Sequence, residues 1–257
     1  MDMRYLAALL LVTTVALAQT PARLAPPARS TEERRQPADT QISASLTAHG
    51  GAQLLQVLTV RLRGKSTLGK IEEPMVVSAS MEGSSRIDYG QPVTRSLVTT
   101  PVGSFEVRDG QRRYRPPHSG AYTGLDLFSV LSIRNTFANG ANRGVVGMQT
   151  LNGREVFRAH VGTDRQQVHY GRVLKDEADI DLDVATGLVA AVHRRGHADE
   201  DLNLTFVDSY TFADYRDVNG IQLPFKIERY FNGRLEETIT VDSFEINPIF
   251  DRGHFES

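Results

Sequence analysis

The chain has 257 residues, a formal net charge of −2 at pH 7, no cysteine and no tryptophan. The near-neutral charge argues against nucleic-acid binding, which normally shows a basic excess. Without cysteine the chain can form neither a disulfide nor a thiol nucleophile, so its stability must come from a large apolar core, which this length can supply. The absence of tryptophan removes the usual aromatic platform for sugars.

The N-terminus has the features of a secretory signal peptide. Arg4 precedes an apolar and small-residue run from Tyr5 to Ala18, which ends in the small-x-small sequence Ala16-Leu17-Ala18. The alternative is a retained membrane anchor, but a membrane span needs about 20 apolar residues and this run is shorter. We therefore predict removal of residues 1–18 and export to the periplasm, with secretion as the second choice.

The segment after the predicted cleavage site is rich in proline and charge, which predicts a disordered linker over residues 19–39. A helical period follows between Thr40 and Leu58, and His49-Gly50-Gly51 interrupts it, so we expect two short helices or one with a break. Residues 40–257 are then predicted to form one domain, because single β-rich domains often reach this length.

Beyond Leu58 the apolar period becomes two. Small or apolar residues from Val60 to Leu68 alternate with Arg61, Arg63 and Lys65, which indicates a strand with one basic, solvated face. That basic row is either an ordinary exposed face or a contact for anionic lipid head groups or a helix C-terminus. A second strand is expected from Met75 to Met81.

Turn dipeptides give the clearest signal for the fold. Asn-Gly and Asp-Gly favour the type I′ turn, whose twist matches that of paired antiparallel strands. Four such dipeptides separate β-like runs and predict a meander of serial hairpins, and Thr186-Gly187 predicts a further hairpin. The four dipeptides are Asp109-Gly110, Asn152-Gly153, Asn219-Gly220 and Asn232-Gly233.

One segment departs from the β pattern. From Gly124 to Phe137 apolar residues cover most of a helix circumference, which is typical of a helix that is buried or that covers an apolar cavity.

Catalytic and metal-binding patterns are weak in this sequence. Asp179, Asp181 and Asp183 start like a calcium loop but lack its glycine and final glutamate, so we interpret them as the solvent face of a strand. His193 and His197, with the acidic residues after them, lack the spacing of a metal site and are interpreted as a polar hairpin end. We expect no enzyme, no metal and no cofactor; a hydrolase using the two histidines is the remaining enzymatic alternative.

Several stretches together resemble the outer-membrane lipoprotein-sorting proteins, the group around the lipoprotein carriers LolA and LolB. The most specific stretch runs from Phe212 through Asp214-Tyr215-Arg216 and Val218-Asn219-Gly220-Ile221 to Leu223-Pro224-Phe225. His49-Gly50-Gly51, Val60-x-Leu62-x-Gly64 and Asp183-x-x-Thr186-Gly187-Leu188 add to the resemblance, which extends from Thr40 to the C-terminus.

The resemblance implies an α+β, mostly antiparallel fold: an open curved sheet, like an unclosed barrel, with helices covering its concave face and an apolar hollow that takes acyl chains. The alternation of Ile221, Leu223, Phe225 and Ile227 is compatible with an apolar inner face. The hollow and its lid are then expected at Leu62, Val77, Leu127, Phe128, Leu131, Phe137, Leu223 and Phe225, and a polar mouth at Arg61, Arg63 and Arg86.

The function expected from this resemblance is a periplasmic carrier whose partners are the acyl chains of lipids or lipoproteins, possessing no transmembrane segment in the mature chain. The alternative is a non-catalytic envelope sensor that uses the same fold to dock onto a protein partner.

Overall fold

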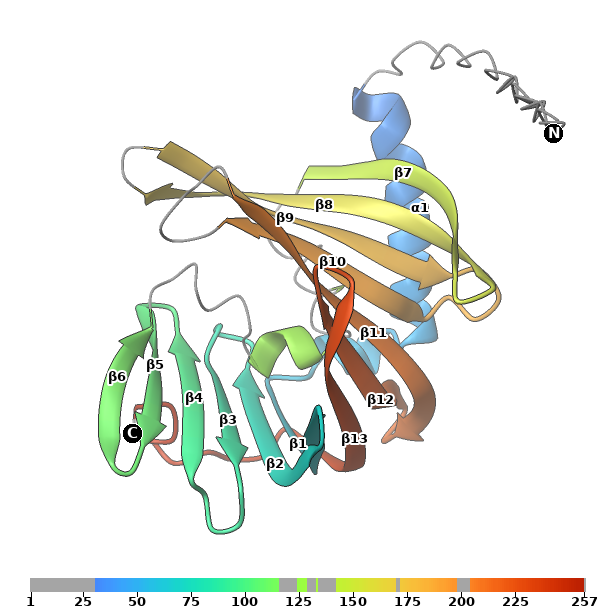
Figure 1. The fold of residues 1–257 in the computed structure, drawn as a ribbon. Coiled ribbons are helices and arrows are strands. Elements are labelled where there is room, and N and C mark those ends of the chain that lie inside the picture. The colour runs from blue at the N-terminus through green and yellow to red at the C-terminus, as the bar shows by residue number, and fades with distance from the viewer. Residues whose placement is uncertain are drawn as a thin grey trace, which may run out of the picture.

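The computed structural model describes residues 31–115, 124–128, 133, 142–169, 172–197 and 204–256. These residues form one antiparallel sheet of 13 strands, two α-helices and a short 3-10 turn, η1 (Figure 1). The helical elements are α1 (Thr31–Ala48), α2 (Ala52–Leu55) and η1 (Gly124–Leu127). The strands are β1 (Thr59–Leu68), β2 (Ile71–Ser80), β3 (Ser85–Tyr89), β4 (Arg95–Thr100), β5 (Gly103–Arg108), β6 (Gln111–Arg115), β7 (Asn142–Leu151), β8 (Arg154–His169), β9 (Arg172–Asp183), β10 (Val189–His197), β11 (Thr205–Val218), β12 (Ile221–Phe231) and β13 (Arg234–Ile246).

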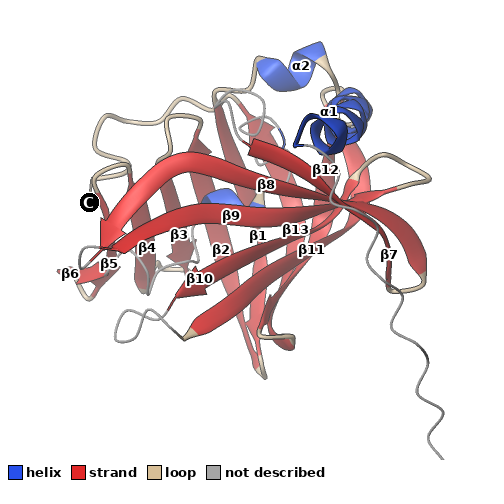
Figure 2. Ribbon diagram, turned by 90° about the horizontal axis from the view of Figure 1, so that it is seen from above, coloured by secondary structure: helices blue, strands red, loops and turns tan. Residues whose placement is uncertain are grey.

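Neighbouring strands in the sheet are also consecutive in the sequence, except at the centre, where β1 pairs with β13. The order is β6-β5-β4-β3-β2-β1-β13-β12-β11-β10-β9-β8-β7, so the first and last strands pair with each other while β6 and β7 are the edges. The sheet curves strongly but does not close, as the view from above shows (Figure 2). This confirms the predicted open, curved sheet of serial hairpins.

The predicted turn dipeptides explain this meander. Each connects its two strands through two residues that both have positive φ, as a type I′ turn requires. Because Asn, Asp and Gly enter this backbone region at the lowest cost, the turns are favoured locally before any long-range packing forms. The φ angles are 52° and 72° at Asp109-Gly110, 49° and 78° at Asn152-Gly153, 55° and 80° at Asn219-Gly220, and 48° and 80° at Asn232-Gly233.

Alternation divides the sheet into two faces, and we call the one that carries the main apolar cluster the inner face and the other the outer face. The helices lie on the inner side: Ile42 of α1 belongs to the apolar cluster, together with Ala159 of β8 and Ile180 of β9. Asp39 of α1 also lies 2.7 Å from the Nε of Arg143 on β7, which fixes the helix beside this edge of the sheet.

Helix α1 begins at Thr31 and continues through Pro37, so it overlaps the end of the predicted linker, residues 31–39. Ala38 is fully buried and Asp39 pairs with Arg143, which holds this part of the helix against the sheet. The predicted break at His49-Gly50-Gly51 separates α1 from α2. Among the described residues, no helix has both the length and the apolarity needed to span a membrane.

The C-terminal segment after β13 crosses the outer face of β1–β6, where it passes behind the strands in Figure 1. Arg86 Nη1 donates to the carbonyl of His254 at 3.3 Å, and Arg112 Nη1 donates to that of Glu256 at 3.5 Å. The Arg61 guanidinium lies 5.0 Å from the centre of the Phe250 ring. The chain end is therefore fastened to the outer face at three points.

Candidate functional site

The inner face of the central strands is largely apolar, with Ser66 and Glu237 as a buried hydrogen-bonded pair among the apolar residues. Leu62 of β1 and Val77 of β2 are direct cross-strand neighbours, and both are fully buried. Leu223 and Phe225 extend the same cluster onto β12. Phe244 of β13 is only partly buried and meets the Phe225 ring at a centroid distance of 5.4 Å.

Residues of η1 cover this apolar surface. The N–H of Gly124 donates to the hydroxyl of Ser85 at 3.1 Å. A Cβ on Gly124 would lie 2.9 Å from Val77 Cγ1, so only glycine allows η1 to approach the strands this closely. Leu127 and Phe128 are then buried against the cluster, and the Phe128 ring lies 6.3 Å from that of Phe244.

An ion pair fixes the other side of η1. Asp126 pairs with Arg194 of β10, whereas Gly124 contacts β2 and β3. Because β10 lies far from β2 in the strand order, η1 bridges the curved sheet across its inner side, where Figure 1 shows it between β2 and β10. Nearby, Asp208 accepts bonds from Tyr210 at 3.0 Å and Arg229 at 2.9 Å. Burial raises the pKa of Tyr210 well above its usual value, so the hydroxyl stays protonated.

The predicted apolar site residues are largely brought together. The described ones are all buried members of one cluster, although their role in binding stays a prediction: Leu62, Val77, Leu127, Phe128, Leu223 and Phe225. Leu131 and Phe137 lie outside the described residues.

The structure does not bring the predicted polar mouth to the inner face. Alternation puts Arg61 and Arg63 opposite to Leu62, and the register Arg61–Ser78–Arg86 gives Arg86 the same outward direction. All three have partners there. Arg61 and Arg63 pair with Glu245 at 2.8 and 3.2 Å, and Arg86 pairs with Asp88 at 2.7 Å.

The stretch with the most specific resemblance holds the helices against the sheet. Tyr215 donates its hydroxyl hydrogen to the carbonyl of Val189 at 2.8 Å, and its ring lies edge-on to His49 at 5.4 Å. The N–H of Val189 donates to His49 Nε2 at 3.1 Å, while His49 Nδ1 donates to the carbonyl of Gln222 at 3.0 Å. Both ring nitrogens are used by a neutral imidazole, and burial lowers the pKa of His49 to about 4.

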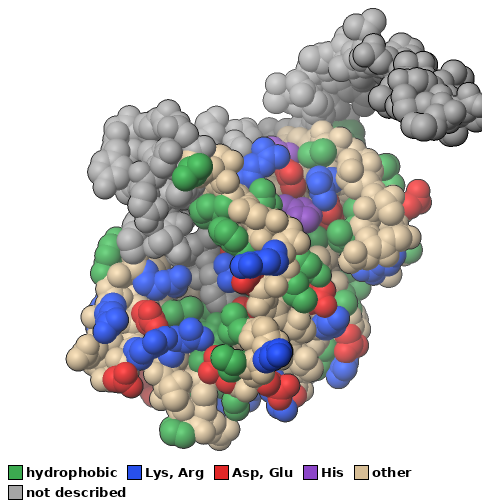
Figure 3. All heavy atoms as spheres, viewed as in Figure 1, with side chains coloured by type: hydrophobic (Ala, Val, Ile, Leu, Met, Phe, Trp, Pro, Cys, Tyr) green, Lys and Arg blue, Asp and Glu red, His purple; other side chains and the backbone are tan. Residues whose placement is uncertain are grey.

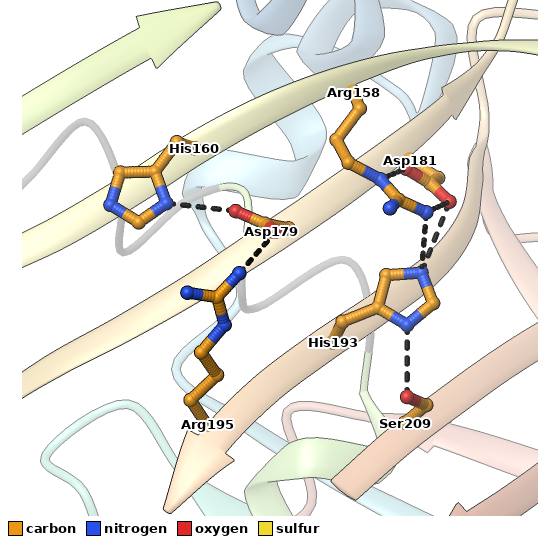
Figure 4. A network of polar contacts seen from close by, with 7 residues as sticks. All are labelled: Arg158, His160, Asp179, Asp181, His193, Arg195 and Ser209. Atoms are coloured by element: carbon orange, nitrogen blue, oxygen red, sulfur yellow. Dashed lines mark hydrogen bonds and ion pairs between the residues drawn. The ribbon is translucent and has the colours of Figure 1, made fainter. Parts of the chain in front are cut away.

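The outer face of β8–β11 carries a polar network that the sequence did not predict (Figure 4). The Arg158 guanidinium makes two bonds to Asp181, at 2.6 and 2.7 Å. His193 Nε2 lies 3.1 Å from Asp181, and its Nδ1 lies 2.9 Å from the Ser209 hydroxyl. Burial by itself raises the pKa of Asp181, but the bonds from Arg158 and His193 outweigh it and lower the pKa.

This network corrects the interpretation of the acidic strand. The aspartates do lie on the face opposite to the core, as predicted. However, they are not solvated, because the side chain of Asp181 has 0% exposure and that of Asp183 has 6%. Arg158 and His193 cover Asp181. The Asp183 side chain accepts hydrogen bonds from the Ala185 and Thr186 N–H groups in the turn that follows β9.

Asp181, His193 and Ser209 have the order of acid, base and hydroxyl found in serine hydrolases. However, the Asp181 carboxylate already binds Arg158 in a bidentate manner, and Arg158 Nη2 lies 3.1 Å from His193 Nε2. Strand β11 is paired on both sides, so the sheet ladders use the backbone N–H groups that could stabilise an oxyanion. The geometry favours a structural ion network. Within the described part of the chain, no group of three acidic or histidine side chains could hold a metal.

Charged side chains are unevenly distributed over the surface in Figure 3. Histidine, acidic and basic side chains mix over β8–β10, whereas Lys and Arg side chains gather over β4–β6 beside apolar ones. A shallow hollow of about 350 Å³ also adjoins this part of the sheet, lined by Val102, Phe105, Arg112 and Tyr114 among others. The alternation of Val98, Phe105 and Tyr114 opposite to Leu97 puts its aromatic lining on the outer face.

Comparison with known protein families finds no matching family, and no curated protein matches the sequence. Solved structures do match the fold. A putative outer membrane lipoprotein-sorting protein domain from Vibrio parahaemolyticus superposes with a TM-score of 0.55 at 10% identity, covering 88% of this chain and 97% of that one. A LolA superfamily protein from Nitrosomonas europaea gives a TM-score of 0.54 at 6% identity, covering 86% and 97%.

A DUF1329 family protein from Desulfovibrio piger is equally similar, with a TM-score of 0.55 at 10% identity and coverage of 86% and 97%. The chain therefore has the fold of the lipoprotein-sorting proteins, as the sequence resemblance implied. The low identities mean that the likeness establishes the fold alone.

Proposed function

We propose that this protein is a periplasmic carrier that binds the acyl chains of lipids or lipoproteins against its inner face, without catalysing a reaction. One observation carries the proposal: an open curved sheet has a large apolar cluster on its inner face, and η1 bridges that face. Export rests on the signal-like residues 1–18 of the sequence.

The energetics of such a site are simple. Each methylene group moved out of water contributes about 0.8 kcal/mol, so long acyl chains need an apolar surface and few polar contacts. Release requires the covering element to move. Among the described residues, η1 contacts the sheet through the Asp126–Arg194 ion pair, the Gly124-to-Ser85 bond and the buried Leu127 and Phe128, and these are the contacts that must open for release.

Native mass spectrometry of gently purified protein tests the proposal first, because a co-purified lipid would identify the cargo directly. Delipidated protein is then titrated with a fluorescent fatty acid. Phe244→Asp should weaken binding about tenfold or more, because it puts a charge on the partly buried edge of the apolar surface.

Leu55→Asp is the matched control, since it makes the same change at an exposed position of α2 and should leave binding unchanged. The carrier proposal fails if neither lipid nor fatty acid binds the wild-type protein, or if both variants bind as the wild type does. A protein partner retained in the absence of any lipid would favour the envelope-sensor alternative.

A further inference from the structure

The inner face ends, at its β6 edge, in an arginine. Leu97, Glu106 and Arg113 are cross-strand neighbours on β4, β5 and β6, and Leu97 packs against the inner apolar cluster. Arg115 is two residues beyond Arg113 and therefore shares its face. Arg115 is partly buried, whereas Arg113 is exposed.

The charges that act on Arg115 come from its own part of the sheet and from the opposite part. Burial lowers the pKa of Arg115, and the positive charges of Arg229 and Arg95 lower it further, against the opposing effect of Glu106. Arg229 is on β12, and six strands separate β6 from β12 in the sheet order: β5, β4, β3, β2, β1 and β13. Two side chains so far apart in the sheet can interact only because its curvature brings them to face each other.

The guanidinium of Arg115 has an unsatisfied hydrogen-bond donor. Its Nη1 is buried and has no hydrogen-bond partner among the described residues. An unsatisfied buried donor on a charged group is costly, and the planar guanidinium is suited to phosphate and carboxylate oxygens. Glu106, the carboxylate that acts on Arg115, pairs with Arg108 at 3.2 Å, while Arg95 and Arg229 pair with Glu73 at 3.3 Å and Asp208 at 2.9 Å.

We propose that Arg115 binds the anionic phosphate of a lipid head group whose acyl chains lie on the inner face. This inference rests on the proposed function and specifies its substrate class: an anionic phospholipid is preferred over a zwitterionic one with the same chains. The neighbouring Arg95, Arg108 and Arg229 are paired with carboxylates, so Arg115 supplies the direct contact.

The test compares phosphatidylglycerol with phosphatidylcholine of identical chains, displacing a fluorescent fatty acid from delipidated protein. Wild-type protein should bind phosphatidylglycerol about tenfold or more tightly, since bonds to charged groups are worth this factor. Arg115→Gln should remove the preference and leave phosphatidylcholine binding unchanged. Arg113→Gln, an exposed arginine on the same strand and face, should keep it, and circular dichroism establishes that both variants fold.

Three outcomes would overturn the proposal. Equal affinities of the wild-type protein for the two lipids would leave the carrier function standing and remove the head-group site. The two arginine variants could lose the preference equally, which would reduce the effect to general charge. Glycerol 3-phosphate without acyl chains could bind in an Arg115-dependent manner as tightly as the lipid, which would make a free anion the ligand. If neither lipid binds, the proposed carrier function itself fails.

Discussion

Each face of the sheet has a partly buried arginine, and the two arginines differ in the hydrogen-bond partners of their guanidinium groups. On the outer face, Arg158 makes two short bonds to Asp181, which His193 also contacts. On the inner face, Arg115 has a buried nitrogen for which the described part of the chain supplies no acceptor. The protein itself supplies the acceptors for Arg158, which therefore needs no ligand. In our proposal, a bound ligand supplies the acceptor for Arg115. Charge burial thus indicates function only where the chain leaves the charge without a partner.

Asp181→Asn should give the largest loss of stability, about 3 kcal/mol, because it leaves the Arg158 guanidinium partly buried without its carboxylate. Urea denaturation followed by circular dichroism measures this loss. Glu245→Gln is the control, since its pairs with Arg61 and Arg63 are more exposed and should be worth under about 1 kcal/mol. Equal losses in the two variants would contradict the structural role of the outer network.

The buried neutral imidazole of His49 adds a third case to the comparison between paired and unpaired buried charges. The pKa of His49 is about 4 in the folded protein and 6.5 in the unfolded chain, so below pH 6.5 the unfolded chain takes up a proton that the folded protein does not. Stability should therefore fall as the pH drops from about 6.5 to 4, by about 3 kcal/mol in total.

The measurement is the free energy of unfolding at several pH values in wild type and His49→Gln. The variant should be less stable at neutral pH but lose the slope between pH 6.5 and 4. The lowered pKa values of Asp179 and Asp181 act in the same direction but only below their usual value of 3.8, so their window is separate. An unchanged slope in the variant would show that His49 is not the group responsible.

The smallest expected effect concerns the element that bridges the inner face. Gly124→Ala should cost about 1 to 3 kcal/mol, because the added Cβ would lie 2.9 Å from Val77 and 3.0 Å from Ser85. It should also speed the release of bound fatty acid, as η1 is pushed from the strands. Gly144→Ala, where no atom lies within 4 Å of the added Cβ, serves as the control for thermal melting and release rate.

The fold was predictable from the sequence where local chemistry decides it. Asn-Gly and Asp-Gly turns set both the hairpin and its register, so Ile221 and Phe231 were placed at the correct ends of β12. The alternation from Thr59 to Leu68 likewise predicted β1 with both of its faces. Such features depend only on neighbours along the chain.

The site was less predictable because it depends on curvature. Alternation assigns Arg61 and Arg115 each to one face of the sheet, but it does not predict that the sheet curves until β6 faces β12. For the same reason the partners of Asp181, which come from β8 and β10, could not be read from β9 alone. The contact that Asp39 of α1 makes with Arg143 of β7 likewise joins segments far apart in the sequence, so local patterns could not predict it.

The pairing of β1 with β13 at the centre of the sheet has a consequence for how the chain folds. The ladder that joins the two halves brings Val60 beside Ile246, so it cannot form until nearly the whole chain has been synthesised. Contacts this distant in sequence are slow to form. The local hairpins on either side can form first, so the ladder between β1 and β13 is expected to be the last part of the sheet to assemble.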